Sequence, residues 1–280
     1  MTQTQFIACA LAAALHLGCG NSSDIDSSDA APDAAIDLTP VAATPGIRCQ
    51  PEERIATIQV SPGDVFAELF DRPSPFLTAP ALTDSDCAFY EYAPASQCPV
   101  CQGGTVCAQS GDCVPAQRQA DDGRVVLRSA SGEQTFESPG GTGVVYGELT
   151  LAGSAFAVEV FAFGQLVTLE ETPFPPPLAG LDVDFVGTGE VPERIDVSWT
   201  ADDDGADVFT HIPINHHAGV ATFTECAAPT TVGSFQVQQA MIEPLAVITG
   251  LEFQSVEHIR FAAAETSRGC VEIRFIDRQF

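Results

Sequence analysis

Short segments rich in Val, Ile, Phe and Thr recur along residues 47–280, separated by turn signals such as Asp122-Gly123 and Asp204-Gly205. The segment 195–199, Ile-Asp-Val-Ser-Trp, alternates apolar and polar residues, as a half-buried strand does. Only about residues 238–245 indicate a turn of helix. Strands at this spacing without intervening helices predict an all-β fold built from antiparallel sheets, a β-sandwich with Trp199 in its core.

A short N-terminal motif, an acidic polar segment and the distribution of cysteines divide the chain into four parts. We expect a signal peptide over residues 1–18, a lipidated cysteine and a disordered acidic tether over 19–46, and a small disulfide-rich strand module over 47–120. Residues 121–280 are expected to form the β-sandwich domain.

The stretch CPVCQGGTVCAQSGDCVP, residues 98–115, holds four cysteines. A thioredoxin-like redox centre would place Cys98-Pro-Val-Cys101 at a helix N-terminus, but the motif is followed by turn-forming residues. A zinc site of four thiolates would need paired Cys-x-x-Cys motifs, and only one is present. We therefore favour disulfides over redox and zinc chemistry.

The count of cysteines supports a disulfide framework. Without Cys9 in the signal and Cys19 at the lipidation site, an even set of eight remains. These are Cys49, Cys87, Cys98, Cys101, Cys107, Cys113, Cys226 and Cys270. The first six form an N-terminal set whose connectivity the sequence leaves open. The remaining two, Cys226 and Cys270, are expected to pair and to join neighbouring strands at an outer face or a strand end.

An apolar run over residues 6–17 is too short to span a bilayer, which takes about 20 residues, but has the length of a signal-peptide core. It ends in Leu17-Gly18-Cys19, which resembles the lipobox of bacterial lipoproteins. The resemblance implies that Cys19 is lipidated and becomes the mature N-terminus, so that the protein contacts the membrane through this lipid. With Gly20 following, it implies the outer membrane. The body of the protein is expected to be extracytoplasmic.

Residues 20–46 are rich in Ser, Asp, Ala and Pro. Such a segment cannot bury enough apolar surface to offset its ordering entropy. We interpret it as a tether that keeps the folded part clear of the membrane.

The formal net charge is −27, and all 11 basic residues other than histidine are arginines. A surface of this charge repels nucleic acid, which excludes it as a partner. The absence of lysine excludes Schiff-base enzymes and phosphate-binding loops that require one.

Two clusters could hold a metal. The Asp-rich segment 202–207, with Asp202 and Asp204, offers oxygen ligands for calcium, although a solvated Asp-Gly hairpin turn is sufficient to explain it and is the favoured interpretation. His211, His216 and His217 could form a histidine metal site, although an exposed turn is the simpler interpretation. We expect no other cofactor.

Tyr90 and Tyr92 share one face of an expected strand beside Cys87. They are the best candidates for a binding surface, the alternative being a packed aromatic strand. No Gly-x-Ser-x-Gly nucleophile motif occurs.

The lipobox, the acidic tether, the cysteine-rich stretch and the β-sandwich together resemble cell-surface lipoproteins of high-GC Gram-negative bacteria. That resemblance implies a location rather than an activity. We expect a non-enzymatic adhesion or binding module of the cell envelope, with an extracellular protein or glycan as ligand. The alternative is a metal-dependent extracellular hydrolase or oxidoreductase that uses His211, His216 and His217.

Overall fold

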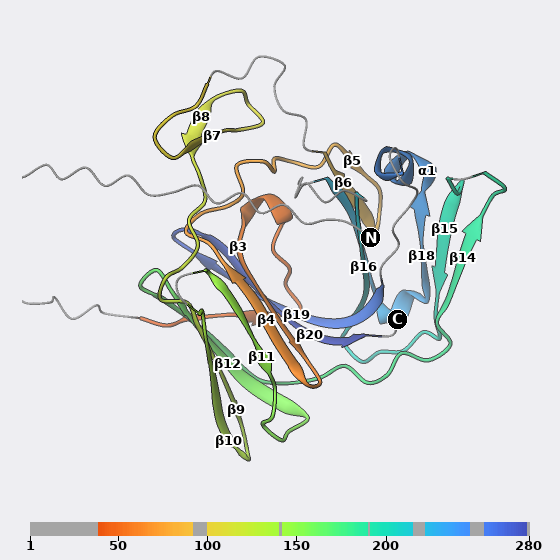
Figure 1. Cartoon of the computed structure of the whole chain (residues 1–280). Coiled ribbons are helices and arrows are strands. Elements are labelled where there is room, and N and C mark those ends of the chain that lie inside the picture. Colours follow the sequence, from red (N-terminus) through yellow and green to blue (C-terminus); the bar gives the residue numbers. More distant parts are fainter. Residues whose placement is uncertain are drawn as a thin grey trace, which may run out of the picture. The chain divides into compact units, whose positions relative to one another are not determined.

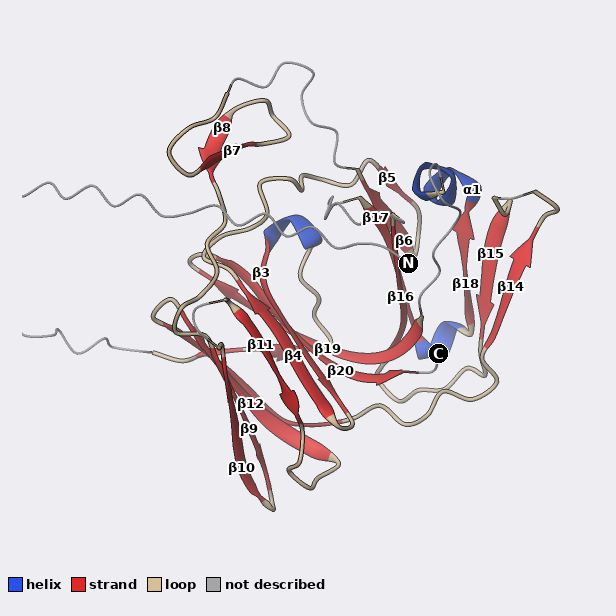
Figure 2. Ribbon diagram, viewed as in Figure 1, coloured by secondary structure: helices blue, strands red, loops and turns tan. Residues whose placement is uncertain are grey.

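Strands dominate the structure (Figure 1; Figure 2). The computed structural model describes residues 39–91, 100–139, 142–189, 191–214, 222–246 and 255–278. Their helical elements are short: α1 (Gln239–Ile242), η1 (Pro51–Glu53), η2 (Thr230–Val232) and η3 (Glu243–Leu245). The predicted all-β fold is confirmed. Among these residues, none of the helices has the length and apolar character needed to cross a membrane.

The largest sheet draws strands from most of the chain. Its members are β2 (Thr44–Pro45), β3 (Arg54–Ser61), β4 (Asp64–Leu69), β5 (Leu82–Thr83), β6 (Cys87–Tyr90), β11 (Val144–Glu148), β16 (Asp207–Pro213), β17 (Phe223–Pro229), β19 (Val256–Thr266) and β20 (Gly269–Arg278). The order is β11-β4-β3-β20-β19-β16-β17-β6-β5, with β2 paired to β19 beside this path. Its pairs are antiparallel except that β3 and β20 run parallel.

Three smaller sheets accompany it. The five-stranded sheet contains β1 (Val41–Ala42), β9 (Arg124–Ser129), β10 (Gly132–Glu137), β12 (Ala155–Ala162) and β13 (Gln165–Pro173), in the order β1-β13-β12-β9-β10. The three-stranded sheet has the order β14-β15-β18, from β14 (Asp182–Val186), β15 (Arg194–Ser198) and β18 (Ser234–Gln238). The two-stranded sheet pairs β7 (Thr105–Cys107) with β8 (Cys113–Pro115).

Two hydrophobic cores cover one face of the large sheet. The first lies between β3, β4 and β20 and the five-stranded sheet, where Ile273 and Phe275 pack with Leu127. The second lies between β16 and β17 and the three-stranded sheet, and contains Trp199 as predicted. The Trp199 indole N–H donates to the carbonyl of Thr230 at 2.8 Å. The large sheet is therefore shared by two sandwiches, and its opposite face carries charged and polar side chains beside a smaller buried cluster of Phe209, Ile259, Phe261 and Ile276.

The predicted boundary at residue 120 is wrong. Residues 38–280 form one compact unit, and β3, β4 and β6 of the expected first module hydrogen-bond into the sheet that also contains β16 to β20. In particular, β3 pairs with β20, the last strand of the chain. Only the part around β7 and β8 forms a sheet of its own. Pairing between strands more than 200 residues apart leaves no local trace in a sequence.

The disulfides correct the predicted pairing of Cys226 with Cys270. Cys226 is bonded to Cys87, which lies directly opposite it on β6, and Cys270 is bonded to Cys49. Within the cysteine-rich stretch, Cys101 is bonded to Cys113. Cys107 is also disulfide-bonded, whereas Cys98 lies outside the described residues. The disulfide interpretation of this stretch is confirmed for its three described cysteines.

The faces of the large sheet explain why the predicted pair cannot form. Cys226 is buried in the second hydrophobic core with Trp199, whereas Cys270 lies with Cys49 and Ala263 in a separate buried cluster on the opposite face. In addition, β19 and β16 separate the strands β20 and β17 that carry the two cysteines. The alternation of apolar residues along β20 correctly put Cys270 on the other face of the sheet from Ile273 and Phe275. Along β17 the same reasoning was wrong, because it turned Phe223 rather than Cys226 toward the core.

Removing the long-range disulfide should destabilise the protein more than removing the short one. Cys49 and Cys270 are 221 residues apart, whereas Cys101 and Cys113 are 12 apart. The loop-entropy model gives about 5 kcal/mol for the double variant Cys49→Ser/Cys270→Ser and about 3 kcal/mol for Cys101→Ser/Cys113→Ser. Urea denaturation of both variants measures the difference, and equal losses would contradict this ranking.

Candidate functional site

The face of the large sheet that the two hydrophobic cores leave uncovered is concave. One ion pair shows this curvature. Arg54 on β3 and Glu225 on β17 are separated by the three strands β20, β19 and β16. In a flat sheet, four steps of about 4.8 Å would hold the two strands about 19 Å apart. Yet Arg54 Nη1 lies 3.3 Å from Glu225 Oε1. The sheet therefore curls toward this face, which we call the concave face.

A β-bulge directs Arg54 onto the concave face. Arg54 is paired with Cys270 and Ala56 with Val271, so Ile55 is an extra residue in β3. Ile55 and Ala56 both belong to the first hydrophobic core. Without the bulge, regular alternation along Arg54, Ile55 and Ala56 would put Arg54 on the same face as Ala56, toward that core.

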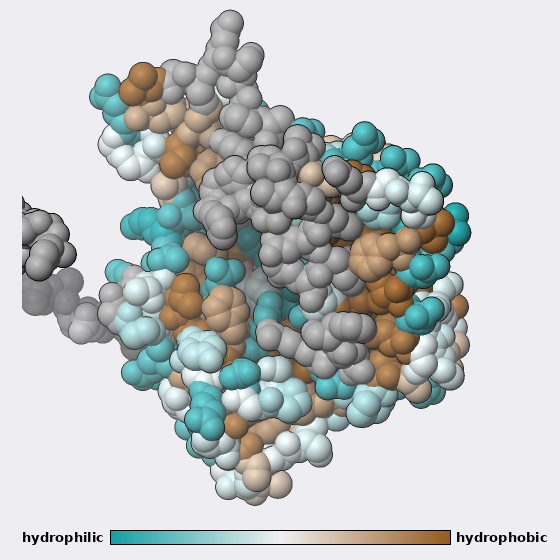
Figure 3. All heavy atoms as spheres, turned by 45° about the vertical axis from the view of Figure 1, so that its right-hand side comes forward, coloured by the Kyte–Doolittle hydropathy of each residue, from teal (hydrophilic) through white to brown (hydrophobic). Residues whose placement is uncertain are grey.

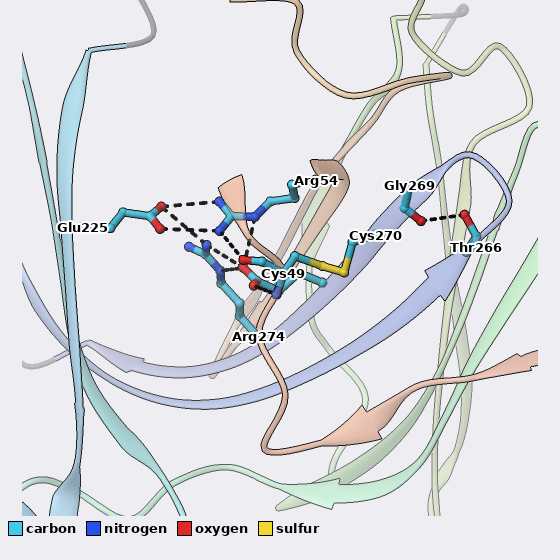
Figure 4. The surroundings of a disulfide bond; sticks show 8 residues. Cys49, Arg54, Glu225, Thr266, Gly269, Cys270 and Arg274 are labelled. Atoms are coloured by element: carbon cyan, nitrogen blue, oxygen red, sulfur yellow. Dashed lines mark hydrogen bonds and ion pairs between the residues drawn. A yellow bond between two sulfur atoms is a disulfide. The ribbon is translucent and has the colours of Figure 1, made fainter. Parts of the chain in front are cut away.

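Four charged side chains form a closed ring on the concave face (Figure 4), which we call the charge cluster: Arg54, Glu225, Glu272 and Arg274. Arg54 contacts Glu225 at 3.3 Å and Glu272 at 3.4 Å. Arg274 contacts Glu272 at 2.6 Å and Glu225 at 3.9 Å. Each charge therefore has a neighbour of opposite sign on both sides, and the cluster is neutral.

Both carboxylates of the charge cluster are buried. The side chain of Glu225 is 5% exposed and that of Glu272 is 0% exposed. Glu272 also accepts a hydrogen bond of 2.8 Å from the backbone N–H of Cys49, so the Cys49–Cys270 disulfide holds this donor beside it. Buried charges are tolerated when they are paired and hydrogen-bonded, as these are.

The charges around Glu225 keep it ionised. Burial alone would raise its pKa, but Arg54, His211 and Arg274 outweigh burial and hold the pKa well below the ordinary value. Arg48 is a further cation near this carboxylate, with Nη2 3.7 Å from Glu225 Oε2.

Two phenylalanines support the guanidinium groups. Arg48 lies over the rings of Phe261 and Phe209, at 4.8 and 5.4 Å from their centroids, and Arg274 lies over the same rings at 5.7 and 5.0 Å. These cation–π contacts fix the planes of both guanidinium groups while their edges remain directed toward the carboxylates.

A cavity of about 470 Å³ opens over the charge cluster. It is lined by Arg54, Thr57, Gln59, Glu68, Phe209, His211, Glu225, Ser255, Glu257 and Arg274. A second cavity, of about 190 Å³, shares five of these residues and adds apolar ones such as Leu77 and Phe223. Figure 3 shows hydrophilic side chains in the recess near the centre of the molecule. The concave face thus offers a polar hollow that continues toward an apolar end.

Of the three histidines predicted as metal ligands, the structure describes His211. His211 lines the cavity, its Nδ1 lies 3.5 Å from Glu225 Oε1, and its ring is tilted against that of Phe223 with centroids 4.8 Å apart. His216 and His217 lie outside the described residues. Among the described residues, no group of three or more His, Cys, Asp or Glu side chains is placed to hold a metal ion.

The two predicted calcium ligands take part in local contacts. Asp204 accepts hydrogen bonds from the Ala206 N–H and the Thr230 hydroxyl, and its other oxygen lies 3.1 Å from Nε2 of the buried His258. Asp202 accepts the backbone N–H of Asp203. Asp204 therefore stabilises its own turn and links it to β19.

The predicted aromatic binding surface is only partly described. Tyr90 is 2% exposed and stacks on Phe223, with ring centroids 5.0 Å apart. Burial, with a contribution from Glu52 and Glu225, raises its pKa. Tyr90 therefore follows the packed alternative, and Tyr92 lies outside the described residues.

The charge cluster was missed by the sequence analysis. A signal was present on β20, where Val271, Ile273 and Phe275 alternate with Glu272 and Arg274. Opposite charges two residues apart on one face of a strand indicate ion pairing across the sheet. Nothing local identified Arg54 or Glu225 as their partners.

No protein-family model matches the chain, and no curated protein matches it. Solved structures similar to it include a two-domain fibronectin type III segment from chicken tenascin, at 13% identity and a TM-score of 0.18, covering 72% of this chain and 96% of that one. The FN1–FN3 domains of chicken CNTN1 are 10% identical with a TM-score of 0.19, covering 77% and 78%. Similarity this low carries no argument about arrangement or function.

Replacing Glu225 by Gln should destabilise the protein by about 3 kcal/mol at neutral pH, because two buried guanidinium groups lose a counter-charge. The loss should shrink with acidification. Because the pKa of Glu225 is lower in the folded than in the unfolded protein, its ionised form stabilises the fold at pH values above its unfolded-state pKa of about 4.3. This contribution is lost as the pH falls through the folded-state pKa. Urea denaturation at a series of pH values measures it.

Glu133→Gln is the matched control. Glu133 pairs with Arg128 at an exposed position, so the control should lose less than about 1 kcal/mol. The pKa of Asp71 is lowered by Arg72 and Arg118, so Asp71 also makes stability depend on pH. This contribution is the same in the wild type, Glu225→Gln and Glu133→Gln, and it cancels when their free energies of unfolding are subtracted. A loss for Glu225→Gln that stays constant down to low pH would contradict the assignment.

Proposed function

We propose that the protein is a lipid-anchored binding protein of the bacterial cell envelope and that the cavity on the concave face is its ligand site. The lipobox at Leu17-Gly18-Cys19 and the acidic tether that follows support the anchor. The disulfides support an oxidising compartment outside the cytoplasm, because such bonds are rare in cytosolic proteins.

The observation that carries the binding function is the contrast between the two faces of the large sheet. One face is covered by two hydrophobic cores, while the other presents Thr57, Gln59, Glu68 and the charge cluster to a cavity of about 470 Å³. Ligand sites commonly have volumes of about 300–1,000 Å³ and a few converging polar groups. A cavity of this size accommodates a small molecule, a peptide side chain or a terminal sugar.

The binding function is favoured over the metal-dependent enzyme. That alternative requires His211 to be a metal ligand together with His216 and His217, but Nδ1 of His211 faces the ionised Glu225. This contact gives His211 a role in stabilising the buried carboxylate, so its place at the cavity does not require a metal. Stoichiometric zinc, copper or iron in the purified protein would reverse this preference.

The variant Cys19→Ala should abolish membrane anchoring. Expressed in a Gram-negative host, the wild-type chain should fractionate with the outer membrane and incorporate labelled fatty acid, because Cys19 is the lipid acceptor. The variant should incorporate none. Cys9→Ala, within the signal core, is the control and should leave labelling unchanged. Equal labelling of the Cys19→Ala variant and the wild type would contradict the proposal.

The variant Gln59→Phe should block ligand binding, because the aromatic ring would project from β3 into the cavity. A panel of sugars, organic acids, amines and short peptides can be screened by the shift in the thermal unfolding midpoint. At least one class should stabilise the wild type and not the variant. Gln236→Phe, at an exposed position of β18 in the three-stranded sheet, is the control. If no compound distinguishes wild type from Gln59→Phe, the proposed site is wrong.

A further inference from the structure

The charged side chains that line the cavity differ in whether they have a partner of opposite charge. In the charge cluster, Arg54 donates to Glu225 and to the carbonyl of Cys49, and Arg274 donates to Glu272. The two guanidinium groups and the two carboxylates neutralise one another. An anion entering the cavity would therefore compete with the buried carboxylates of Glu225 and Glu272 for guanidinium groups that are already ion-paired.

Glu68 lines the cavity without a partner of opposite charge among the described residues. It lies on β4 directly opposite Thr57 on β3, which in turn lies opposite Glu272 on β20, so the three residues form one row across the concave face. The Glu68 side chain is exposed toward the cavity. No ion pair or hydrogen bond of its carboxylate is found among the described residues, and partial burial raises its pKa. An anion at this position lacks a counter-charge.

The surrounding groups favour a cation in the cavity. Besides Glu68, the lining contains the side-chain oxygens of Thr57, Gln59 and Ser255. The formal charge of −27 raises the concentration of cations around the whole protein and lowers that of anions. The hydrogen-bond acceptors in the cavity and the negative charge of the whole protein therefore both favour binding of a cation.

The size of the cavity favours an organic cation over a metal ion. A volume of about 470 Å³ far exceeds one ion, and no metal-ligand cluster forms among the described residues. An alkylammonium group needs only a carboxylate and a few neutral acceptors, and its carbon chain could extend toward the apolar end near Leu77 and Phe223.

We propose that the cavity binds an organic ammonium group, with Glu68 as its counter-ion and the neutral charge cluster as the floor of the site. The ligand class is a primary amine on an aliphatic chain, such as a diamine or a lysine side chain of a peptide. This inference rests on the proposed binding function and specifies its ligand.

Three five-carbon probes of equal length test the class of ligand: 1,5-diaminopentane, pentane-1,5-diol and glutarate, which are a dication, a neutral molecule and a dianion. Isothermal titration calorimetry of the full folded unit at an ionic strength of about 0.15 M limits diffuse attraction to the acidic surface. The diamine should bind at one site, and the diol and glutarate should not. Tighter binding of glutarate or the diol would overturn the proposal.

Glu68→Gln tests the counter-ion. The amide has nearly the same shape without the charge, so diamine affinity should fall by about tenfold or more. Glu137→Gln, on β10 of the five-stranded sheet, removes one charge away from the cavity and should leave the affinity unchanged. Equal loss in both variants, or none in Glu68→Gln, would overturn the site. Urea midpoints equal to that of the wild type verify that both variants fold.

Two further outcomes separate this inference from the proposed function. If calcium or magnesium displaces the diamine stoichiometrically, the site is a metal site and the inference fails. If another class of compound binds and Gln59→Phe abolishes that binding, the cavity is a ligand site but the ammonium assignment is wrong. If no compound responds to Gln59→Phe, both proposals fail together.

Discussion

The ion pair between Arg54 and Glu225 is the contact on which the concave face depends. It joins strands that are four steps apart in the large sheet, so it can exist only if the sheet curls. Both ends are buried among partners of opposite sign, and Glu272 and Arg274 complete the ring. Because an unpaired buried charge is costly, the curl of the sheet and the pairing of the cluster support each other.

The same region ties the beginning of the folded unit to its end. Cys49 is bonded to Cys270, and β3 runs parallel to β20, the last strand. The bulge at Ile55 reconciles two demands on β3, since it keeps Ile55 and Ala56 in the first core while Arg54 reaches the concave face. The cavity therefore lies over a region fixed by three contacts: the Cys49–Cys270 disulfide, the pairing of β3 with β20, and the charge cluster. Glu68, also in its lining, has no partner of opposite charge among the described residues.

Local patterns predicted local structure well. The alternation over 195–199 placed Trp199 in a core, and the recurrent short strands identified the all-β class. The same reasoning failed for Phe223 and Cys226, because both faces of β17 are buried: one against the second core, the other against Tyr90 and the arginines. Where both faces are buried, hydrophobic parity no longer tells which side is the core.

By itself, the sequence determined what depends on composition and short-range periodicity: the strands, the turns between them, the oxidised cysteines and the signal that resembles a lipobox. The tertiary structure decided the partners. It paired Cys49 with Cys270 and Cys87 with Cys226, joined the expected two modules through β3 and β20, and brought Arg54 and Glu225 into contact across 171 residues of chain. Such contacts depend on the order of strands and the curl of the sheet, which arise from the packing of the whole unit and leave no signature in neighbouring residues.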